Sequence, residues 1–372
     1  MQPKPAEEIA CCEPSYGPQS SPYERSGYRL CLFVEDFVQT PVRPVPKVKT
    51  DLSSIDIFGT IKTRLNISRM NYKVAPGLYC VGNPNPKSPV LVTANYKLTF
   101  DVLRKQLSGL DVWILVLDTQ GINVWCSAGK RIFSTEEVVR SVRHSCLDQV
   151  VAHRKLILPQ LSATGVSAQQ VKKGCGFEVV WGPVRANDIK PFLDNGMKAE
   201  PEMRQVTFSF RERVVLIPVE LTQILKPLLW LIVIAFLLSG IGWDVFSIKA
   251  AWLRGLMLIA AAVTGIISGA VLAPAFLPWI PTRTFALKGG ITGLITGAGI
   301  VWLLWEKLDG WGALGLIFCT LAISSYMAMN FTGSTPFTSM SGVEKEMRKA
   351  IPLQMIAGLM AVVVWVGSAF AR

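Results

Sequence analysis

The stretch that decides the fold of the first half of the chain is Asp111-Val-Trp-Ile-Leu-Val-Leu-Asp118, continued by Thr119-Gln-Gly121 and Ile122-Asn-Val-Trp-Cys-Ser-Ala-Gly-Lys130. An uninterrupted apolar run closed by a turn signal predicts a strand that is buried on both faces. Asn123 after the turn predicts the N-cap of a short helix, with Cys126 in its first turn. Strand, tight turn and helix in this order are typical of α/β sheets, whose ligands bind beyond the carboxyl ends of the strands.

The same alternation extends over residues 56–200. The apolar runs are Gly77–Val81, Val90–Thr93, Val112–Leu117, Lys155–Leu158 and Phe177–Val180. The helical stretches between them are Leu98–Leu107, Thr135–Cys146, Ser167–Lys172 and Asn187–Leu193. This order predicts a Rossmann-like domain with a parallel sheet, and its ligand-binding residues are expected after the strand ends. Residues 1–55, rich in Pro, Ser and charge, are expected to form an irregular N-terminal extension.

The second half of the chain has a different composition. Over the whole chain, half of the residues are hydrophobic and only 17% are charged, against about a quarter in typical soluble domains. Most of the charged residues lie in residues 1–220, and residues 221–372 contain long tracts without any. After a linker at 201–220, residues 221–372 are expected to form an all-α membrane domain, since about 20 apolar residues cross a bilayer as one helix. The five expected transmembrane helices are 222–242, 252–273, 285–305, 311–330 and 351–370.

Basic residues favour one orientation in the membrane. They are more frequent on the side that also carries the first half, which predicts a multi-pass protein of the cytoplasmic (inner) membrane with its α/β domain in the cytoplasm. Residues 1–20 lack the apolar core of a signal peptide, in agreement with this orientation. The net charge of +12 comes with no nucleic-acid-binding motif, so no nucleic-acid partner is expected.

Cysteine spacing excludes several metal sites. No Cys-x-x-Cys pair occurs, so no iron–sulfur cluster is expected in this chain. No phosphate-binding glycine motif occurs either. At Cys126 two interpretations are open: a buried free cysteine, or a thiolate that is favoured by the helix dipole and available to a soft metal. Ser127, Ala128 and Gly129 are small and would let a broad, flat molecule approach the backbone.

A polar loop separates the fourth and fifth expected helices. It runs from Asn330 to Ser339, and its hydroxyl and glycine residues are Thr332, Gly333, Ser334, Thr335, Thr338 and Ser339. Turn chemistry explains such a composition, and so does a docking or substrate-handling role on the side of the α/β domain.

The segment Asn123-Val-Trp-Cys-Ser-Ala-Gly-Lys130 closely resembles the cap-helix motif of the corrinoid protein of anaerobic mercury methylation, the HgcA family. The resemblance continues in Pro89–Thr99, Leu115–Asp118, Leu158–Leu161, Gly176–Phe177, Gly182–Ala186, the loop Phe331–Ser339 and the five apolar tracts. Ser127 departs from the family motif, which has Ala there. The α/β domain is also similar to the corrinoid domain of the corrinoid iron–sulfur protein of the acetyl-CoA pathway.

The resemblance implies a cobalamin-type corrinoid, bound base-off, with Cys126 as the lower axial ligand of cobalt. It implies that Thr93 and Asn95 line the corrinoid and that the cap helix lies beneath the ring. The cap residues are Asn123, Trp125, Cys126, Ser127, Ala128, Gly129 and Lys130. The nucleotide tail is expected at Gly182, Pro183, Val184, Arg185 and Ala186.

The function implied is that of a corrinoid-dependent methyltransferase, which passes a methyl group from methyl-cobalt to Hg(II) and so produces methylmercury. An alternative is a membrane-bound corrinoid methyl carrier of one-carbon metabolism, and a third is a transporter or sensor with a regulatory α/β domain. The implied partners are a methyl donor from one-carbon metabolism and a ferredoxin-like protein with two 4Fe–4S clusters, which would donate electrons and also mercury. The vicinal pair Cys11 and Cys12 is a candidate mercury relay or an incidental feature of the extension.

Overall fold

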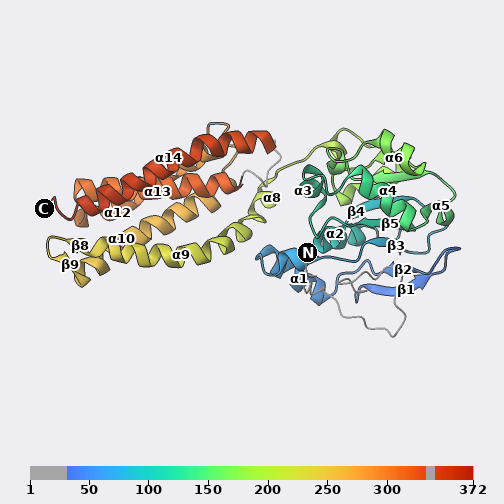
Figure 1. Cartoon of the computed structure of the whole chain (residues 1–372), viewed down its shortest axis with the longest axis horizontal. Helices are drawn as coiled ribbons and strands as arrows, with labels where there is room; N and C mark the ends of the chain where they lie inside the picture. Colours follow the sequence, from blue (N-terminus) through green and yellow to red (C-terminus); the bar gives the residue numbers. More distant parts are fainter. Residues whose placement is uncertain (1–31, 332–339, 372) are drawn as a thin grey trace, which may run out of the picture. The chain divides into compact units, whose positions relative to one another are not determined.

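The computed structural model describes residues 32–331 and 340–371, and the chain divides into two compact units (Figure 1). The first unit, called the head below, contains the chain up to Thr63 and Ile67–Val206; the second, the helical unit, contains Arg64–Asn66 and Thr207–Arg372. The predicted relay at Cys11 and Cys12 lies outside the described residues. So do the loop residues Thr332, Gly333, Ser334, Thr335, Thr338 and Ser339.

The head is built on a seven-stranded mixed sheet in the order β1-β2-β3-β5-β4-β6-β7. The strands are β1 (Val34–Val38), β2 (Val45–Val48), β3 (Gly77–Val81), β4 (Val90–Ala94), β5 (Val112–Leu117), β6 (Lys155–Leu158) and β7 (Glu178–Trp181). Strands β5, β4, β6 and β7 are parallel, as predicted, whereas β3 pairs antiparallel with β5. The prediction of a wholly parallel sheet is therefore wrong at β3. The segment between β3 and β4 contains no helix, and it is too short for the crossover that a parallel connection requires.

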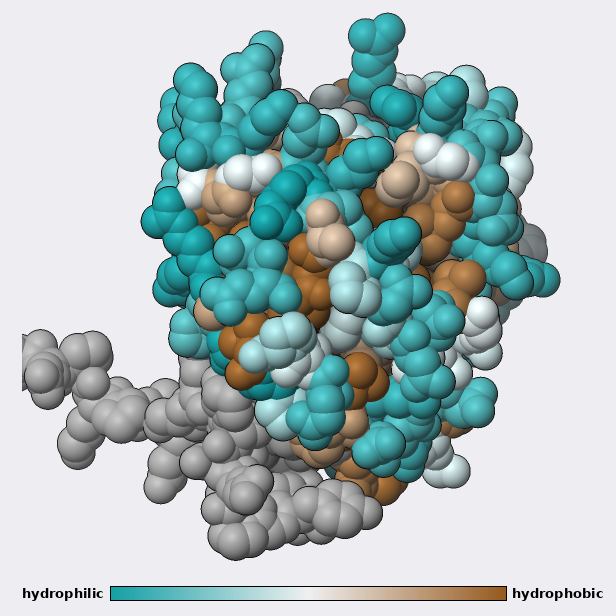
Figure 2. Space-filling model, turned by 90° about the vertical axis from the view of Figure 1, so that its right-hand side faces the viewer, coloured by the Kyte–Doolittle hydropathy of each residue, from teal (hydrophilic) through white to brown (hydrophobic). Residues whose placement is uncertain are grey.

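Strand β5 lies inside the sheet and is buried along its whole length, as predicted. Trp113, Leu115 and Leu117 pack into one hydrophobic cluster, whereas Ile114 and Val116 pack into a second one. The helices that contribute to these clusters are α2 (Lys97–Gln106), α3 (Val124–Gly129), α4 (Thr135–His144), α5 (Leu147–Val150), α6 (Ala168–Cys175) and α7 (Ile189–Asp194). The face of the protein in Figure 2 is mainly hydrophilic, with apolar residues gathered in small groups.

The expectation of an irregular extension over residues 1–55 is wrong within its described part. Residues 34–48 form β1 and β2, and helix α1 (Ser54–Arg64) begins just before the predicted boundary. Val45 and Val48 are buried, and Lys47 of β2 pairs with Cys80 of β3. These strands are too short, and too interrupted by proline, to show a strand period in the sequence.

The helical unit contains five helices long and apolar enough to cross a membrane, as predicted. Its elements are α8 (Phe210–Val214), α9 (Ile217–Gly240), α10 (Ile248–Ile267), α11 (Ala273–Ala275), α12 (Phe285–Leu303), α13 (Gly310–Asn330) and α14 (Met340–Gly367). A small hairpin of β8 (Ile241–Gly242) and β9 (Val245–Phe246) interrupts the all-α pattern. The predicted linker 201–220 is wrong in its second half, because Ser209 and Glu212 form a capping box that starts a helix at Phe210.

Small residues bring α12 and α13 close together. A Cβ atom added to Gly289 would lie 2.5 Å from the Ser324 carbonyl oxygen, and one added to Gly293 would lie 2.6 Å from the Ser324 Cβ. Both distances are below van der Waals contact. Ser324 Oγ also donates a 2.6 Å hydrogen bond to the Gly289 carbonyl. These glycines therefore serve helix packing, as small residues do in membrane bundles.

Candidate functional site

The helix that carries Cys126 is capped as the sequence predicts. Asn123 precedes α3, and its Oδ1 accepts a 2.9 Å hydrogen bond from the backbone N–H of Cys126. Val124 and Ala128 pack into the core of the head, whereas Cys126 is exposed. The short helix thus holds a thiol at the surface, and its backbone is fixed by the Asn123 cap and by the packing of Val124 and Ala128. The interpretation of Cys126 as a buried core cysteine is wrong.

The small residues after Cys126 face two ways. Ser127 and Ala128 are almost fully buried, whereas Gly129 and Lys130 are exposed. The Ser127 hydroxyl donates to the carbonyl oxygens of Asn123 (2.6 Å) and Val124 (3.1 Å). It stabilises the first turn of α3 from inside, so its side chain is not part of an exposed cap surface. A Cβ atom added to Gly129 would meet nothing within 4 Å, so the surface there is open.

Asn95, predicted to line the ligand, is instead fully buried. Its Oδ1 accepts hydrogen bonds from the backbone N–H groups of Thr119 (3.0 Å) and Gly121 (2.9 Å), and from the Thr119 hydroxyl (2.9 Å). Its Nδ2 donates to Asp118 at 3.2 Å. Gly121 has a φ of +74°, which glycine adopts without strain. Asn95 therefore fixes the turn that connects β5 to α3, and it acts on Cys126 only through that turn.

A cavity of about 350 Å³ lies in the head at the carboxyl ends of the parallel strands. Thr93 lies at the carboxyl end of β4, Gly182–Ala186 follow β7, Asn123 caps α3 and Trp125 lies in its first turn. The structure thus brings together three of the segments that the sequence predicted to act together. Cys126 directly follows the α3 residues that line the cavity.

The cavity has walls that the sequence analysis missed. Leu98, Thr99 and Val102 of α2 line one side, and Ile189 of α7 lines another. The side chain of Val102 is 45% exposed. Val102 is thus an apolar residue on the exposed side of an amphipathic helix, and this pattern is the signal that could have indicated the wall. The walls are mainly apolar, and among the predicted tail residues Arg185 is exposed at the rim. Such walls suit a bulky ligand with polar edges.

The metal chemistry open to this site is limited by its donors. Within residues 32–331 and 340–371, no group of three or more His, Cys, Asp or Glu side chains could hold a metal ion. A metal bound to the Cys126 thiolate there would have to bring most of its other ligands with it, as the metal of a macrocyclic cofactor does. An exposed thiol beside an apolar cavity fits such a cofactor.

Two other cysteines in the head differ from Cys126. Burial raises the pKa of the Cys80 thiol in β3 to about 12. Burial also raises the pKa of the Cys175 thiol at the end of α6. Both thiols therefore stay protonated at neutral pH, and a protonated thiol is a poor metal ligand and a poor nucleophile. Of these three, only Cys126 is exposed.

Comparison with known proteins relates the head to one enzyme system. Residues 53–193 match the family model of the CO dehydrogenase/acetyl-CoA synthase delta subunit. The chain is similar to the acetyl-CoA decarbonylase/synthase complex subunit gamma of Archaeoglobus fulgidus, with 32% identity over 143 residues, 37% of this chain and 30% of the relative. The same subunit of Methanopyrus kandleri is 33% identical over 124 residues, 33% of this chain and 26% of the relative.

The family-model match lies within the head and ends before the first candidate span at Phe210. The chain spans less than a third of the length of the curated relatives that it matches. The matches support the predicted relation to the corrinoid protein of the acetyl-CoA pathway. They do not support the narrower resemblance to the mercury-methylating family. The cavity, α3 and Cys126 all lie inside the matched region.

Proposed function

We propose that the head binds a corrinoid and that the protein is a membrane-bound, corrinoid-dependent methyltransferase. The observation that carries the proposal is the exposed Cys126 thiol on a capped helix, next to the cavity at the strand ends. The match of residues 53–193 to the CO dehydrogenase/acetyl-CoA synthase delta-subunit family, and the similarity to acetyl-CoA decarbonylase/synthase gamma subunits, support the same choice of cofactor class.

Each part of the site has its own task in this proposal. The Cys126 thiolate would hold the cobalt of the corrinoid, and the hydrogen bond from Cys126 N–H to Asn123 would keep its backbone in place. Thr93, Trp125 and Gly182–Ala186 enclose the cavity that receives the nucleotide tail. Asn95 positions the turn before α3 from within the head. When bound, the corrinoid supplies a cobalt centre that accepts a methyl group and releases it with its bonding electron pair to an electrophile.

Hg(II) is the acceptor that we propose, because it is an electrophile that requires a methyl group with carbanion character. The Cys126 thiolate would donate electron density to the bound metal and so would favour that mode of release. The resemblance of residues 123–130 to the cap motif of the mercury-methylating family points the same way. Turnover then needs a reductant, for which a partner with two 4Fe–4S clusters is suited.

A second candidate function is that of a corrinoid methyl carrier in one-carbon metabolism. The comparisons favour it, because the matched relatives are subunits of acetyl-CoA decarbonylase/synthase. In both candidates the same thiol and the same cavity hold the cofactor, and only the acceptor differs. The candidate spans fix either protein to a bilayer, with the head proposed on the cytoplasmic side.

The test is anaerobic purification of the full chain, reconstitution with cobalamin, and methyl loading. The loaded protein is then offered Hg(II) or the acceptors of one-carbon metabolism, and the methylated products are quantified. Methylmercury as the main product supports the first proposal. Methylation of one-carbon acceptors alone supports the carrier. A visible spectrum without bound corrinoid would contradict both and favour a regulatory α/β domain.

A further inference from the structure

Helix α1 is amphipathic, but it is oriented opposite to the usual arrangement. Its buried residues are Asp56 and Thr63, and Gly59 packs against the Tyr72 ring. Its outer side carries Ile57 and Phe58, which are 52% and 58% exposed. A helix on the surface of a soluble domain normally buries its apolar side. Here that side is turned outward.

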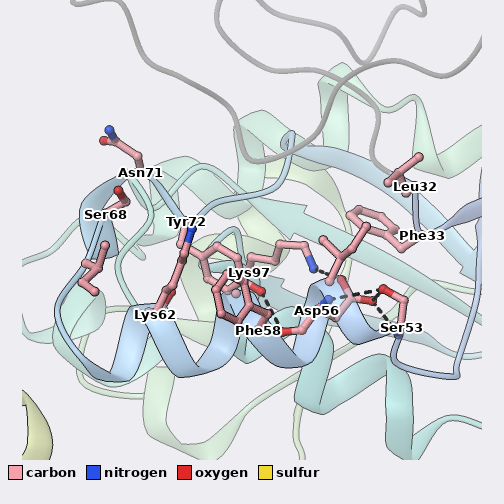
Figure 3. A pocket seen from close by; sticks show the side chains of 14 residues that line it. Leu32, Phe33, Ser53, Asp56, Phe58, Lys62, Ser68, Asn71, Tyr72 and Lys97 are labelled. Atoms are coloured by element: carbon pink, nitrogen blue, oxygen red, sulfur yellow. Dashed lines mark hydrogen bonds and ion pairs between the residues drawn. The ribbon is translucent and has the colours of Figure 1, made fainter.

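A buried ion cluster holds α1 in this orientation, and Figure 3 shows two of its members, Asp56 and Lys97. The Lys97 ammonium lies 2.6 Å from the Asp56 carboxylate and 2.7 Å from that of Asp101. Arg104 lies 2.8 Å from each of the same two carboxylates. Burial alone would raise the pKa of Asp56, but the hydrogen bond and charge of Lys97 and the hydrogen bonds from Ser53 outweigh it and hold this pKa well below its usual range. Rotation of α1 to bury its apolar side would leave these charges unpaired, at high cost.

The apolar surface continues beyond α1. We define the α1 face as the exposed apolar residues Ile55, Ile57, Phe58, Ile61, Ile67 and Met70 together with the basic residues Lys62 and Arg69. Lys62 Nζ lies 4.7 Å from the centre of the Phe58 ring, so the charge sits directly beside the apolar side chains. Residues 57–70 contain no Asp or Glu. Contiguous apolar surface of this kind marks an interaction site.

We propose that the α1 face inserts into the interface of the bilayer in which the candidate spans are anchored. Apolar side chains mixed with Lys and Arg, without acidic residues, are the composition of interfacial helices that bind anionic lipid. The head is joined to the candidate spans by a short segment, because the head ends at Val206 and the first candidate span begins at Phe210. Such a tether raises the effective concentration of lipid at the head, so a modest surface suffices. This role is independent of the corrinoid.

The experiment uses photo-crosslinking in the full chain. p-Benzoylphenylalanine replaces Phe58, and the protein is placed in nanodiscs of equal parts phosphatidylcholine and phosphatidylglycerol. The matched control replaces Phe37 in β1, another exposed phenylalanine of the head, 39% exposed. After illumination, mass spectrometry identifies the adducts. The expected result is a lipid adduct at position 58 and a severalfold lower yield at position 37.

A second variant tests the role of charge. Lys62→Ala, in the chain that carries the analogue at position 58, is expected to lower the lipid adduct by up to about fivefold, which corresponds to about 1 kcal/mol for one basic residue at an anionic surface. Nanodiscs of phosphatidylcholine alone should lower it as well. A protein adduct at position 58, no adduct there, or equal lipid yields at both positions would overturn the proposal. Corrinoid binding by the same samples is measured separately, so that failure of the proposed function is distinguishable.

Discussion

Helices α1 and α3 both expose side chains that a soluble domain would normally bury, but they do so in opposite ways. In α3 the exposed group is a thiol, and the buried neighbours Ser127 and Ala128 hold its backbone. In α1 the exposed groups are apolar, and the buried groups include the Asp56 carboxylate, which pairs with Lys97 and Arg104. The buried charges near α1 pair with one another within the head, whereas the Cys126 thiol is exposed. We therefore expect chemical reactivity at α3 and membrane binding at α1.

The largest effect is expected at the ion cluster. Lys97→Met removes one of the two cations that pair with both Asp56 and Asp101, and loss of one partner from a buried ion pair costs about 3–5 kcal/mol of unfolding free energy. Denaturant unfolding of the full chain in detergent measures it. Lys172→Met is the matched control, since its ion pair with Glu178 is exposed to solvent and its loss should change the free energy of unfolding far less. Equal losses in the two variants would show that the cluster does not hold α1.

Cys126→Ala should separate stability from chemistry. Because the side chain is exposed, the free energy of unfolding should change by less than about 0.5 kcal/mol. Methyl transfer should fall by about a hundredfold or more, since even residues that only support a metal ligand contribute about 10–100-fold. Rates are measured with cobalamin-reconstituted protein. The control Cys175→Ala removes a half-buried thiol outside the cavity and should keep the wild-type rate; a normal rate in Cys126→Ala would refute the ligand role.

Asn95→Ala tests whether the turn before α3 positions Cys126. The change leaves the N–H groups of Thr119 and Gly121 without their acceptor, at a cost of about 1–3 kcal/mol. Corrinoid affinity, measured by titration and absorption, should fall about tenfold. Asn195→Ala is the control, because that amide only donates to the Lys198 carbonyl in an exposed loop. Unchanged affinity in Asn95→Ala would mean that α3 holds its place without this turn.

The smallest effect is expected in acid. The pKa of Asp56 is lower in the folded than in the unfolded state, so its ion pairs stabilise the head above the ordinary carboxyl range and lose that contribution as the pH falls below about 4. Unfolding midpoints between pH 3 and pH 6 measure this slope. The slope should be shallower in Lys97→Met than in wild type, and identical slopes would contradict the assignment to this cluster.

The order of strands and helices in residues 56–200 could be predicted because each element has either a clear hydrophobic periodicity or an unbroken apolar run. The N-cap at Asn123 followed from its place after the turn. The grouping of Thr93, Trp125 and Gly182–Ala186 was implied by the family resemblance, and these residues line one cavity. The direction of β3 was not readable, because it depends on a long-range pairing with β5. Asn95 was misassigned, because a strand-end position does not tell which way a side chain points.

The inverted orientation of α1 was also beyond sequence analysis. Its pattern of apolar and polar residues is the same whichever side is buried, and the choice is made by Lys97 and Arg104, far along the chain. The five apolar helices, by contrast, were predictable from composition alone, because hydropathy is a local property. The starts of the first and the fifth were missed: the first begins at the capping box of Ser209 and Glu212, and the fifth candidate span begins at Gly342 and not at 351.

The central claim is that the Cys126 sulfur binds the metal of a cofactor held at the strand ends of the head. X-ray absorption at the cobalt edge, on full-length protein reconstituted anaerobically with cobalamin, measures it directly. We expect one sulfur neighbour of cobalt in wild type and none in Cys126→Ala, with corrinoid still detectable in both. A wild-type spectrum with only nitrogen and oxygen neighbours would contradict the claim.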